Sequence, residues 1–223
     1  MDDQILLIDK PAGMTSFGVV ARIRRVLSKN PLYSGGKKIK VGHTGTLDPF
    51  ATGLMILVIG KECKNAGLYS KLDKVYESTI LLGQNSTTGD PEGEISDVSN
   101  RVPSETEIKK TLKIFTGEIT QRPPAYSAIK INGQRAYDLA RKGEFIEMPM
   151  RQVTIYCLEL IEYNYPEIII RVHVSSGTYI RSLAEDIGKK LHIGAYCTQL
   201  RRIEINKWRV KDAYKLSDFG IDS

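Results

Sequence analysis

The chain has 223 residues, with a hydrophobic share of 41%, a charged share of 26% and a formal net charge of +6. These values are typical of a globular protein of one large or two small domains. No stretch approaches the roughly 20 apolar residues of a transmembrane helix. The acidic start, Met1–Gln4, is unlike a secretory signal.

The cysteines bear on compartment and metal content. Cys63, Cys157 and Cys197 are far apart and odd in number, and none has the spacing of a zinc ligand pair. This pattern argues against a disulfide framework and against a zinc site. We therefore expect a cytoplasmic protein without a membrane segment and without a bound metal.

Apolar periodicity predicts an alternation of helices and strands. Helices are expected from a cap at Ser16 to Lys29, over Lys61–Leu72, from a capping box at Ser104 to Phe115, and over Arg135–Lys142 and Thr178–Leu191. Strands are expected over Ile5–Ile8, Leu54–Ile59, Lys74–Leu82, Tyr126–Ile131, Gln152–Tyr163, Glu167–Val174 and Leu200–Val210. Hairpin-like pairs among these strands favour an α+β fold with a mixed, mostly antiparallel β-sheet core and flanking helices.

We expect residues 1–223 to form a single domain with a surface excursion around residues 83–103. That excursion is acidic and rich in turn-forming residues. No internal repeat is visible.

Basic residues accumulate early in the chain. No acidic residue lies between Asp9 and Asp48, and this gap includes Arg22, Arg24, Arg25, Lys29, Lys37, Lys38 and Lys40. Such a run is usually a solvated face. Because it directly precedes a polar loop with a histidine and an aspartate, it also fits an approach surface for phosphates.

That loop covers residues 41–53. Its glycines and Pro49 favour irregular backbone, and it contains His43 and Asp48. The apolar run Leu54–Ile59 follows at once and predicts a buried strand. A reachable loop on a rigid strand is a common place for catalytic residues, although a plain glycine-rich turn with a surface aspartate has the same pattern.

Three further side chains have both a chemical and a structural interpretation. Asp48 could be a nucleophile or base, or could brace its own turn. Tyr76, on a predicted strand, could stack on a base or pack in the core. Arg181 lies in the first turn of a helix, where a cation gains nothing from the helix dipole. It therefore needs a buried carboxylate or a phosphate, unless it pairs with Glu185 one turn later.

Seven short motifs in order resemble the TruB-type tRNA pseudouridine(55) synthases. They are Asp9–Ser16, Gly42–Pro49 with Ala51–Gly53, Lys74–Tyr76, Pro123–Lys130, Gly133–Tyr137, Ser176–Leu183 and Leu200–Arg202. The resemblance implies the pseudouridine synthase fold and an isomerase. This enzyme would flip uridine-55 out of the T-loop of tRNA and convert it to pseudouridine, without metal or organic cofactor.

The resemblance also implies roles for residues. Asp48 matches the catalytic aspartate, Tyr76 the tyrosine that stacks on the target base, and Arg181 the arginine that pairs with that aspartate. His43 matches the histidine that fills the space left by the flipped base, while Tyr179 and Leu200 match contacts to the flipped nucleotide.

Further residues are assigned to substrate binding or to the loop. Lys10 belongs to a motif that braces the active-site loop. Lys130, Arg135, Arg201 and Arg202 are expected to contact phosphates.

Many relatives carry a C-terminal RNA-binding domain of the PUA type, and the motifs of this chain do not include one. We expect a monomer that acts on the T-arm of tRNA. A tRNA-folding module without required turnover, or a related synthase acting on another RNA, are the alternatives.

Overall fold

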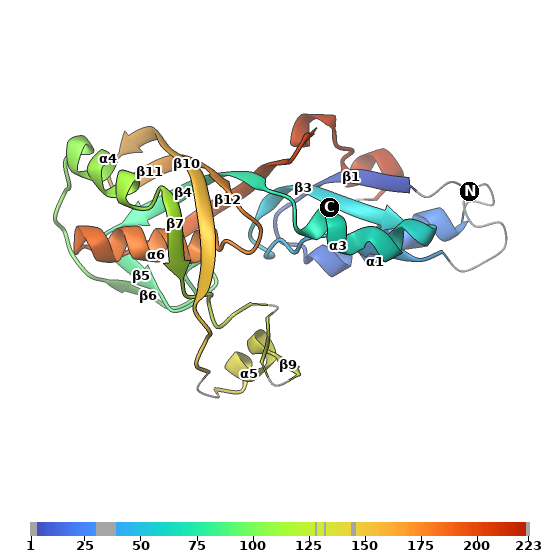
Figure 1. Cartoon of the computed structure of the whole chain (residues 1–223), viewed down its shortest axis with the longest axis horizontal. Helices are drawn as coiled ribbons and strands as arrows, with labels where there is room; N and C mark the ends of the chain where they lie inside the picture. The colour runs from blue at the N-terminus through green and yellow to red at the C-terminus, as the bar shows by residue number, and fades with distance from the viewer. Residues whose placement is uncertain (1–3, 30–38, 128, 132, 144–145, 222–223) are drawn as a thin grey trace. The chain divides into compact units, whose positions relative to one another are not determined.

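The structure is a computed structural model that describes residues 4–29, 39–127, 129–131, 133–143 and 146–221 (Figure 1). It divides into two compact units. Unit 1 holds residues 1–75 and 201–223, and unit 2 holds residues 76–200. Of the early basic run, Lys37 and Lys38 lie outside the described residues. The prediction that the whole chain is one catalytic domain stays a prediction.

Unit 1 is built around the buried strand β3 (Thr52–Ile59). Antiparallel to it run β1 (Gln4–Lys10) and the short β2 (Val41–His43), while the end of β12 (Ala195–Ile205) runs parallel to its start. The remaining elements are α1 (Ser16–Lys29), η1 (Gly60–Asn65), α3 (Ala66–Ser70), β13 (Trp208–Arg209), η2 (Val210–Asp212) and η3 (Leu216–Phe219).

Unit 1 brings β3 and β12 into unusually close contact at Gly53. A Cβ atom there would lie 2.3 Å from the carbonyl oxygen of Arg202, and the residue has a φ of +106°. Only glycine fits both restrictions. This contact places Arg202 next to the loop that carries Asp48.

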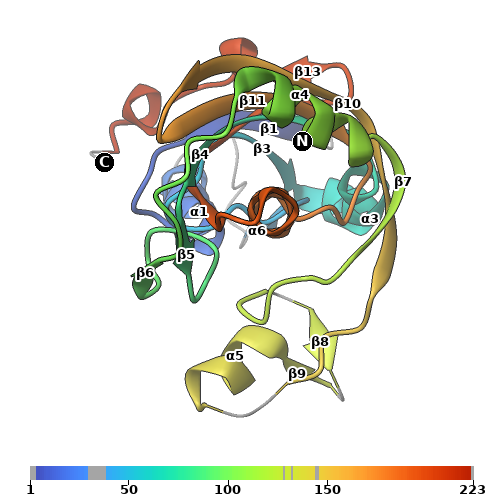
Figure 2. The ribbon, with the colours of Figure 1, turned by 90° about the vertical axis from the view of Figure 1, so that its left-hand side faces the viewer.

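Unit 2 contains a curved sheet in which strands lie in the order β12–β4–β11–β10–β7. Figure 2 shows α6 along the concave side of this sheet, and α4 packs against both α6 and β10. The bounds are β4 (Lys74–Leu82), β7 (Gly117–Gln121), β10 (Arg151–Asn164), β11 (Glu167–Val174), α4 (Glu105–Ile114) and α6 (Ile180–Leu191). Strand β10 pairs antiparallel with both β11 and β7.

Two small ribbons complete unit 2. One pairs β5 (Gln84–Ser86) with β6 (Ile95–Asp97), and the other pairs β8 (Lys130–Ile131) with β9 (Gln134–Arg135) and leads into α5 (Ala136–Arg141). The second ribbon has its own small core of Ile129, Ala136 and Met148. The first ribbon, β5 with β6, lies inside the predicted excursion over 83–103, so that excursion contains regular secondary structure.

The mixed α+β architecture is confirmed, and so are the predicted strand over Lys74–Leu82 and the hairpin of β10 and β11. The serine half of the predicted capping box is present: Ser104 is the N-cap of α4, and its hydroxyl accepts a hydrogen bond from the Glu107 N–H at 3.2 Å. At α1 the predicted cap is wrong. Thr15 Oγ1 accepts from the Gly18 N–H at 2.9 Å, and Ser16 instead bonds to a distant loop.

Three strand boundaries also differ from the prediction. Val41–His43 is a strand because it pairs with the far end of β3. Among the described residues of 126–131, the strand covers Lys130 and Ile131 alone, since the Ser127 N–H closes a tight turn onto the Ala125 carbonyl. Strand β12 starts earlier than expected and ends at Ile205, because Asn206 takes a φ of +50° and turns the chain back. Strand β7 was not predicted at all.

Candidate active site

The loop that carries Asp48 is held through its backbone on both sides of the aspartate. The buried Ser16 hydroxyl accepts from the Leu47 N–H at 2.8 Å and donates to the Leu47 carbonyl at 2.9 Å. Lys10 Nζ donates to the Pro49 carbonyl at 3.1 Å. The residues that flank Asp48 are therefore both anchored, while Asp48 itself is half-buried.

Lys10 is completely buried, with a relative exposure of 0%. Besides the bond to the loop, its ammonium donates to the carbonyls of Pro11 at 2.8 Å and Met14 at 2.6 Å. A single ammonium thus links the turn after β1 to the loop after β2. The Lys10 side chain therefore faces inward, which fits the predicted role of bracing the loop.

Arg202 holds the other end of the same loop. Its side chain is 1% exposed, and its guanidinium donates to the carbonyls of Leu54 at 2.7 Å and Gly45 at 3.1 Å. The predicted phosphate contact of Arg202 does not fit this geometry, because the group points into unit 1. A second buried cation, Lys74, is affected by the charge of Arg202. The pKa of Lys74 is lowered to about 8 by burial and by the positive Arg202 guanidinium.

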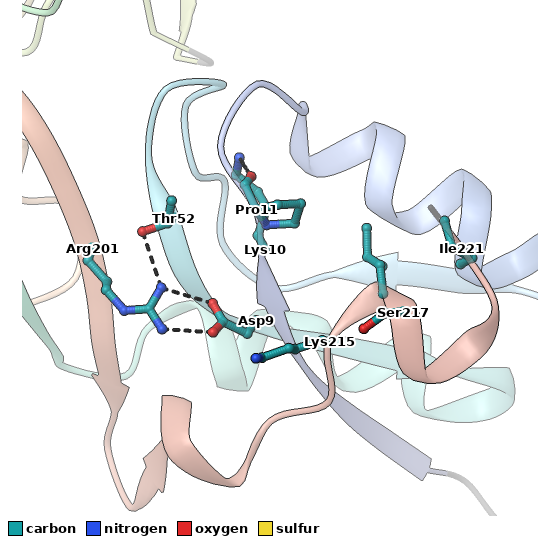
Figure 3. A pocket seen from close by; sticks show the side chains of 9 residues that line it. Asp9, Lys10, Pro11, Thr52, Arg201, Lys215, Ser217 and Ile221 are labelled. Carbon is teal, nitrogen blue, oxygen red and sulfur yellow. Dashed lines mark hydrogen bonds and ion pairs between the residues drawn. The ribbon is translucent and has the colours of Figure 1, made fainter. Parts of the chain in front are cut away.

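Arg201, the residue before it, points the other way into a cavity of about 410 Å³ on unit 1 (Figure 3). Its guanidinium contacts the Asp9 carboxylate with both nitrogens, at 3.1 and 2.7 Å, and the Thr52 hydroxyl at 3.3 Å. Lys215 and Ser217 also line this cavity. Arg201 is therefore accessible, but Asp9 already neutralises much of its charge.

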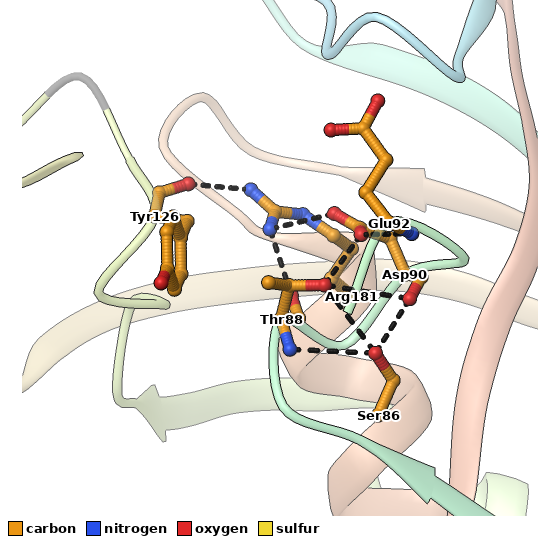
Figure 4. Close-up of polar contacts among 6 residues, drawn as sticks. All are labelled: Ser86, Thr88, Asp90, Glu92, Tyr126 and Arg181. Atoms are coloured by element: carbon orange, nitrogen blue, oxygen red, sulfur yellow. Dashed lines mark hydrogen bonds and ion pairs between the residues drawn. The ribbon is translucent and has the colours of Figure 1, made fainter. Parts of the chain in front are cut away.

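In unit 2, Arg181 lies at the start of α6 with only 3% of its side chain exposed (Figure 4). Nη1 contacts Asp90 Oδ2 at 3.0 Å and donates to the Thr88 carbonyl at 2.9 Å, and Nη2 donates to the Tyr126 carbonyl at 2.8 Å. The position of Arg181 in the first turn predicted a buried carboxylate or a phosphate nearby, with pairing to Glu185 as the alternative, and the family resemblance implied Asp48. Asp90 is a partner that the sequence did not indicate.

Asp90 sits in the turn between β5 and β6, inside the predicted excursion. The excursion is fixed to the rest of unit 2 a second time by Arg101, which pairs with Glu107 at 2.8 Å and donates to the Leu191 carbonyl at the end of α6. Asp48 belongs to unit 1 and Arg181 to unit 2, so their predicted pairing stays a prediction.

Tyr76 on β4 and Leu200 on β12 belong to neighbouring strands of unit 2, and each is 8% exposed. Tyr179 directly precedes α6 and packs against the core of the β8–β9–α5 segment. Its backbone is clamped by the buried Gln121 side chain, which accepts from the Tyr179 N–H at 2.8 Å and donates to its carbonyl at 3.0 Å. Gln121 was not singled out from the sequence.

Basic side chains gather on the β8–β9–α5 segment. Lys130 is exposed there and lines a shallow hollow of about 690 Å³ whose other charged residues are Arg135, Asp138, Arg141 and Lys142. The guanidinium groups of Arg135 and Arg141 lie 5.8 and 5.7 Å from the ring of Tyr137. Four cations and one carboxylate make this hollow a favourable place for an anion.

His43 is half-buried at the end of β2, in register with Leu57 of β3. In the part of the chain that the structure describes, no three His, Cys, Asp or Glu side chains lie close enough together to hold a metal ion. Within the same residues, every helix is too short or too polar to pass through a lipid bilayer.

Comparison with known proteins decides the family. The model of the "TruB family pseudouridylate synthase (N terminal domain)" matches residues 31–180. The chain belongs to the TruB family. A tRNA pseudouridine synthase B from Aquifex aeolicus is 42% identical over 219 residues, which cover 97% of this chain and 73% of the relative. One from Phocaeicola vulgatus is 43% identical over 220 residues, covering 98% and 92%.

The fold of this TruB family member matches solved structures too. A chain of a Cbf5–Nop10–Gar1 complex superposes with a TM-score of 0.72 at 30% identity, over 96% of this chain. This chain spans about half of that one, 52% of its length. The pseudouridine synthase fold inferred from the motifs is therefore confirmed.

Some residues around the candidate site gave a weak signal in the sequence. Ser86, Thr88 and Asp90 form a hydroxyl-rich turn before Pro91, which looks like an ordinary acidic loop. Ser16 looks like a helix cap, since it stands one residue from the actual one. In both cases the partner lies at least 31 residues away along the chain, so local pattern does not indicate the contact.

Proposed function

We propose that this TruB family member is a tRNA pseudouridine-55 synthase, an isomerase that acts on the T-loop of tRNA. Family membership and the names of relatives that cover nearly the whole chain support this proposal. The structural observation that supports it most is the anchoring of the Asp48 loop by Lys10, Ser16 and Arg202. A reactive carboxylate needs a fixed backbone, and these contacts provide one.

The reaction that we assign to the site rearranges one nucleotide. The N1–C1′ bond of the flipped uridine breaks, the uracil turns, and a C5–C1′ bond forms, while C5 loses a proton and N1 gains one. No other reactant is consumed. We assign to Asp48 the attack on C1′ or C6, or assistance to glycal formation; all three use an ionised carboxylate beside the base.

We assign to Tyr76 the stacking on the uracil ring and acceptance of the C5 proton. We assign Arg181 as the partner of Asp48, where its positive charge would hold the carboxylate in its ionised form. Asp90 neutralises part of the Arg181 charge, so the support for this assignment is the orientation of the guanidinium, which the ion pair fixes at the start of α6. The contact between Arg181 and Asp48 is itself part of the proposal.

Base contacts and phosphate contacts fall to different residues. We assign His43, Tyr179 and Leu200 to the flipped nucleotide and its vacated place. We assign Lys130 to phosphates, with Arg135 beside it, since both are exposed on a basic hollow. Arg201 is a weaker candidate because of Asp9. We assign Lys10 and Arg202 to holding the Asp48 loop. For Arg202 this role replaces the predicted phosphate contact.

The deciding experiment incubates purified protein with unmodified tRNA transcript and maps pseudouridine afterwards. We expect product at position 55 with wild type and none with Asp48→Asn, which keeps the shape of the side chain and removes its charge. The Kd of the variant for tRNA should stay within about three-fold of wild type, since phosphate contacts supply most of the affinity. Normal product from Asp48→Asn would remove the aspartate from the mechanism.

The other outcomes identify the alternatives. Tight tRNA binding without product from wild type would favour a tRNA-folding module. Product on a different RNA, with position 55 unmodified, would favour a related synthase. A tRNA affinity that does not fall with added salt would contradict the basic binding surface.

We further propose that the enzyme works as a cytoplasmic monomer. The spacing of its three cysteines, which suits no disulfide framework, supports a reducing compartment. Light scattering of the protein with and without tRNA tests the monomer; a mass of twice 25.0 kDa for the free protein would contradict it.

A further inference from the structure

We propose that Thr88 is a positioning residue for Arg181, acting through the orientation of Asp90, with Ser86 as its support. This inference rests on the proposed function, because it gives the buried turn between β5 and β6 a task in the isomerase reaction. Ser86, Thr88 and Asp90 all belong to unit 2, whereas the loop with Asp48 belongs to unit 1. They would therefore affect the reaction through the Arg181 guanidinium alone.

The two carboxylate oxygens of Asp90 have separate partners. Oδ1 accepts from the Thr88 hydroxyl at 2.5 Å and from the Glu92 N–H at 3.0 Å, while Oδ2 faces Arg181 Nη1 at 3.0 Å. Two donors on Oδ1 prevent the carboxylate from rotating about its last side-chain bond. Oδ2 is therefore held toward the arginine. The short contact to the hydroxyl is in the range of a charge-assisted hydrogen bond.

Thr88 also contacts the arginine directly. Its main-chain carbonyl accepts from the same Nη1 nitrogen at 2.9 Å. One residue thus orients the carboxylate with its side chain and supplies a second acceptor with its backbone. Arg181 Nη1 lies in a fork between Asp90 and Thr88, so a shift of either one moves the guanidinium (Figure 4).

Ser86 fixes the turn from the other side. Its buried hydroxyl donates to the Asp90 main-chain carbonyl at 2.5 Å and accepts from the Thr88 N–H at 3.3 Å. The serine therefore holds the backbone of both residues in the fork. Because it does not touch the carboxylate, we expect its removal to have a smaller effect than removal of the Thr88 hydroxyl.

The hydroxyls of Ser86 and Thr88 lie directly against Gly93. A Cβ atom at Gly93 would lie 2.5 Å from Ser86 Oγ and 2.5 Å from Thr88 Oγ1. Across the turn, Gly89 is covered by Glu185 of α6, whose Oε1 would lie 2.5 Å from an added Cβ. The turn is thus closely packed at both glycines.

The experiment compares three variants in single-turnover assays on tRNA. Thr88→Val keeps the branched shape and removes the hydroxyl, and Thr88→Ser keeps the hydroxyl. The control is Thr87→Val, because the exposed neighbouring hydroxyl accepts from the Glu94 N–H and does not contact Asp90. We expect Thr88→Val to lower the rate about 10-fold, the effect of one hydrogen bond to a charged group.

The expected pattern separates positioning from stability. The Kd for tRNA should stay within about two-fold in all variants, Thr88→Ser should recover most of the rate, and Thr87→Val should match wild type. In an Asp90→Asn background, Thr88→Val should cause little further loss, because its effect passes through the carboxylate. Equal losses in Thr87→Val and Thr88→Val, or a full additional loss in the Asp90→Asn background, would overturn the proposal.

A readout without turnover keeps the two proposals distinguishable. The NMR signal of the Arg181 guanidinium should shift in Thr88→Val and stay in place in Thr87→Val. A shift in protein that makes no pseudouridine would leave the positioning intact and reject the isomerase. An unshifted signal in active protein would reject the positioning. Should Thr88→Val fail to fold, Ser86→Ala replaces it, and an unchanged rate and spectrum would reject the proposal.

Discussion

Arg202 in unit 1 and Arg181 in unit 2 are both almost completely buried, yet their surroundings differ. Arg202 donates to the main-chain carbonyls of Gly45 and Leu54. Arg181 donates to the carboxylate of Asp90 as well as to two carbonyls. The first arrangement ties segments of chain together. The second also neutralises the charge and orients the guanidinium.

The same contrast extends to the lysines of unit 1. Lys74 Nζ donates to the Ser70 carbonyl at 2.7 Å and to the Leu72 carbonyl, and Lys10 donates to three carbonyls. Unit 1 therefore uses buried cations to hold backbone, above all the backbone around Asp48. Unit 2 uses a buried carboxylate to hold a cation. The expected effects of substitution follow from this difference.

The largest effect is expected for Arg181→Met. It leaves the Asp90 carboxylate buried without its cation, and the free energy of unfolding should fall by about 3–5 kcal/mol. Urea unfolding followed by circular dichroism measures this change. Adding Asp90→Asn should restore part of the loss, because the remaining group is then neutral. If the double variant is less stable than the single one, the ion pair is not the cause.

Lys74 should make the stability of the protein rise as the pH increases from neutral to alkaline. Its pKa is about 8 in the folded protein, against an ordinary lysine value of 10.5. Between these values the unfolded chain binds more protons than the folded one, so this group makes stability rise with pH, by up to about 3 kcal/mol in total. Lys74→Met should remove that rise. The measurement is the difference between wild type and variant in unfolding free energy from pH 7 to pH 10, and a constant difference would contradict it.

Ser16→Ala should destabilise the aspartate loop. It leaves the N–H and carbonyl of Leu47 without their hydroxyl partner in a buried place, which costs about 2 kcal/mol. We also expect slower turnover, because Leu47 precedes Asp48. Ser70→Ala is the control, since its hydroxyl is exposed and donates to the carbonyl of the nearby Gly67. Equal changes in melting temperature for the two variants would show that the Leu47 contact is unimportant.

The smallest effect is expected for the exposed pair of Arg171 and Glu77 on the sheet of unit 2. Its atoms are 2.6 Å apart, but the side chains are 47% and 37% exposed. Arg171→Met should change the free energy of unfolding by less than about 1 kcal/mol, and less still in high salt. A loss as large as that of Arg181→Met would mean that burial does not separate the two arginines.

Much of this molecule can be predicted from local pattern. The apolar run of β3, the serine cap before α4 and the β10–β11 hairpin are each encoded within a few neighbouring residues, and they fold as predicted. The strand β7 is missed because five residues that start with glycine carry little periodicity. Burial explains the error at Arg202: a basic residue next to Arg201 looks like a phosphate contact until its surroundings are known.

The sequence by itself determined the α+β architecture through apolar periodicity, and it determined the family and the loop in which Asp48 lies through the order of short motifs, because each element and each motif depends on residues close together in the chain. The tertiary structure alone decided which groups meet the buried cations. Asp90 lies 91 positions before Arg181, and Gly45 lies 157 before Arg202. A charge removed from water must find its partner in space, and separation along the chain does not indicate where that partner is.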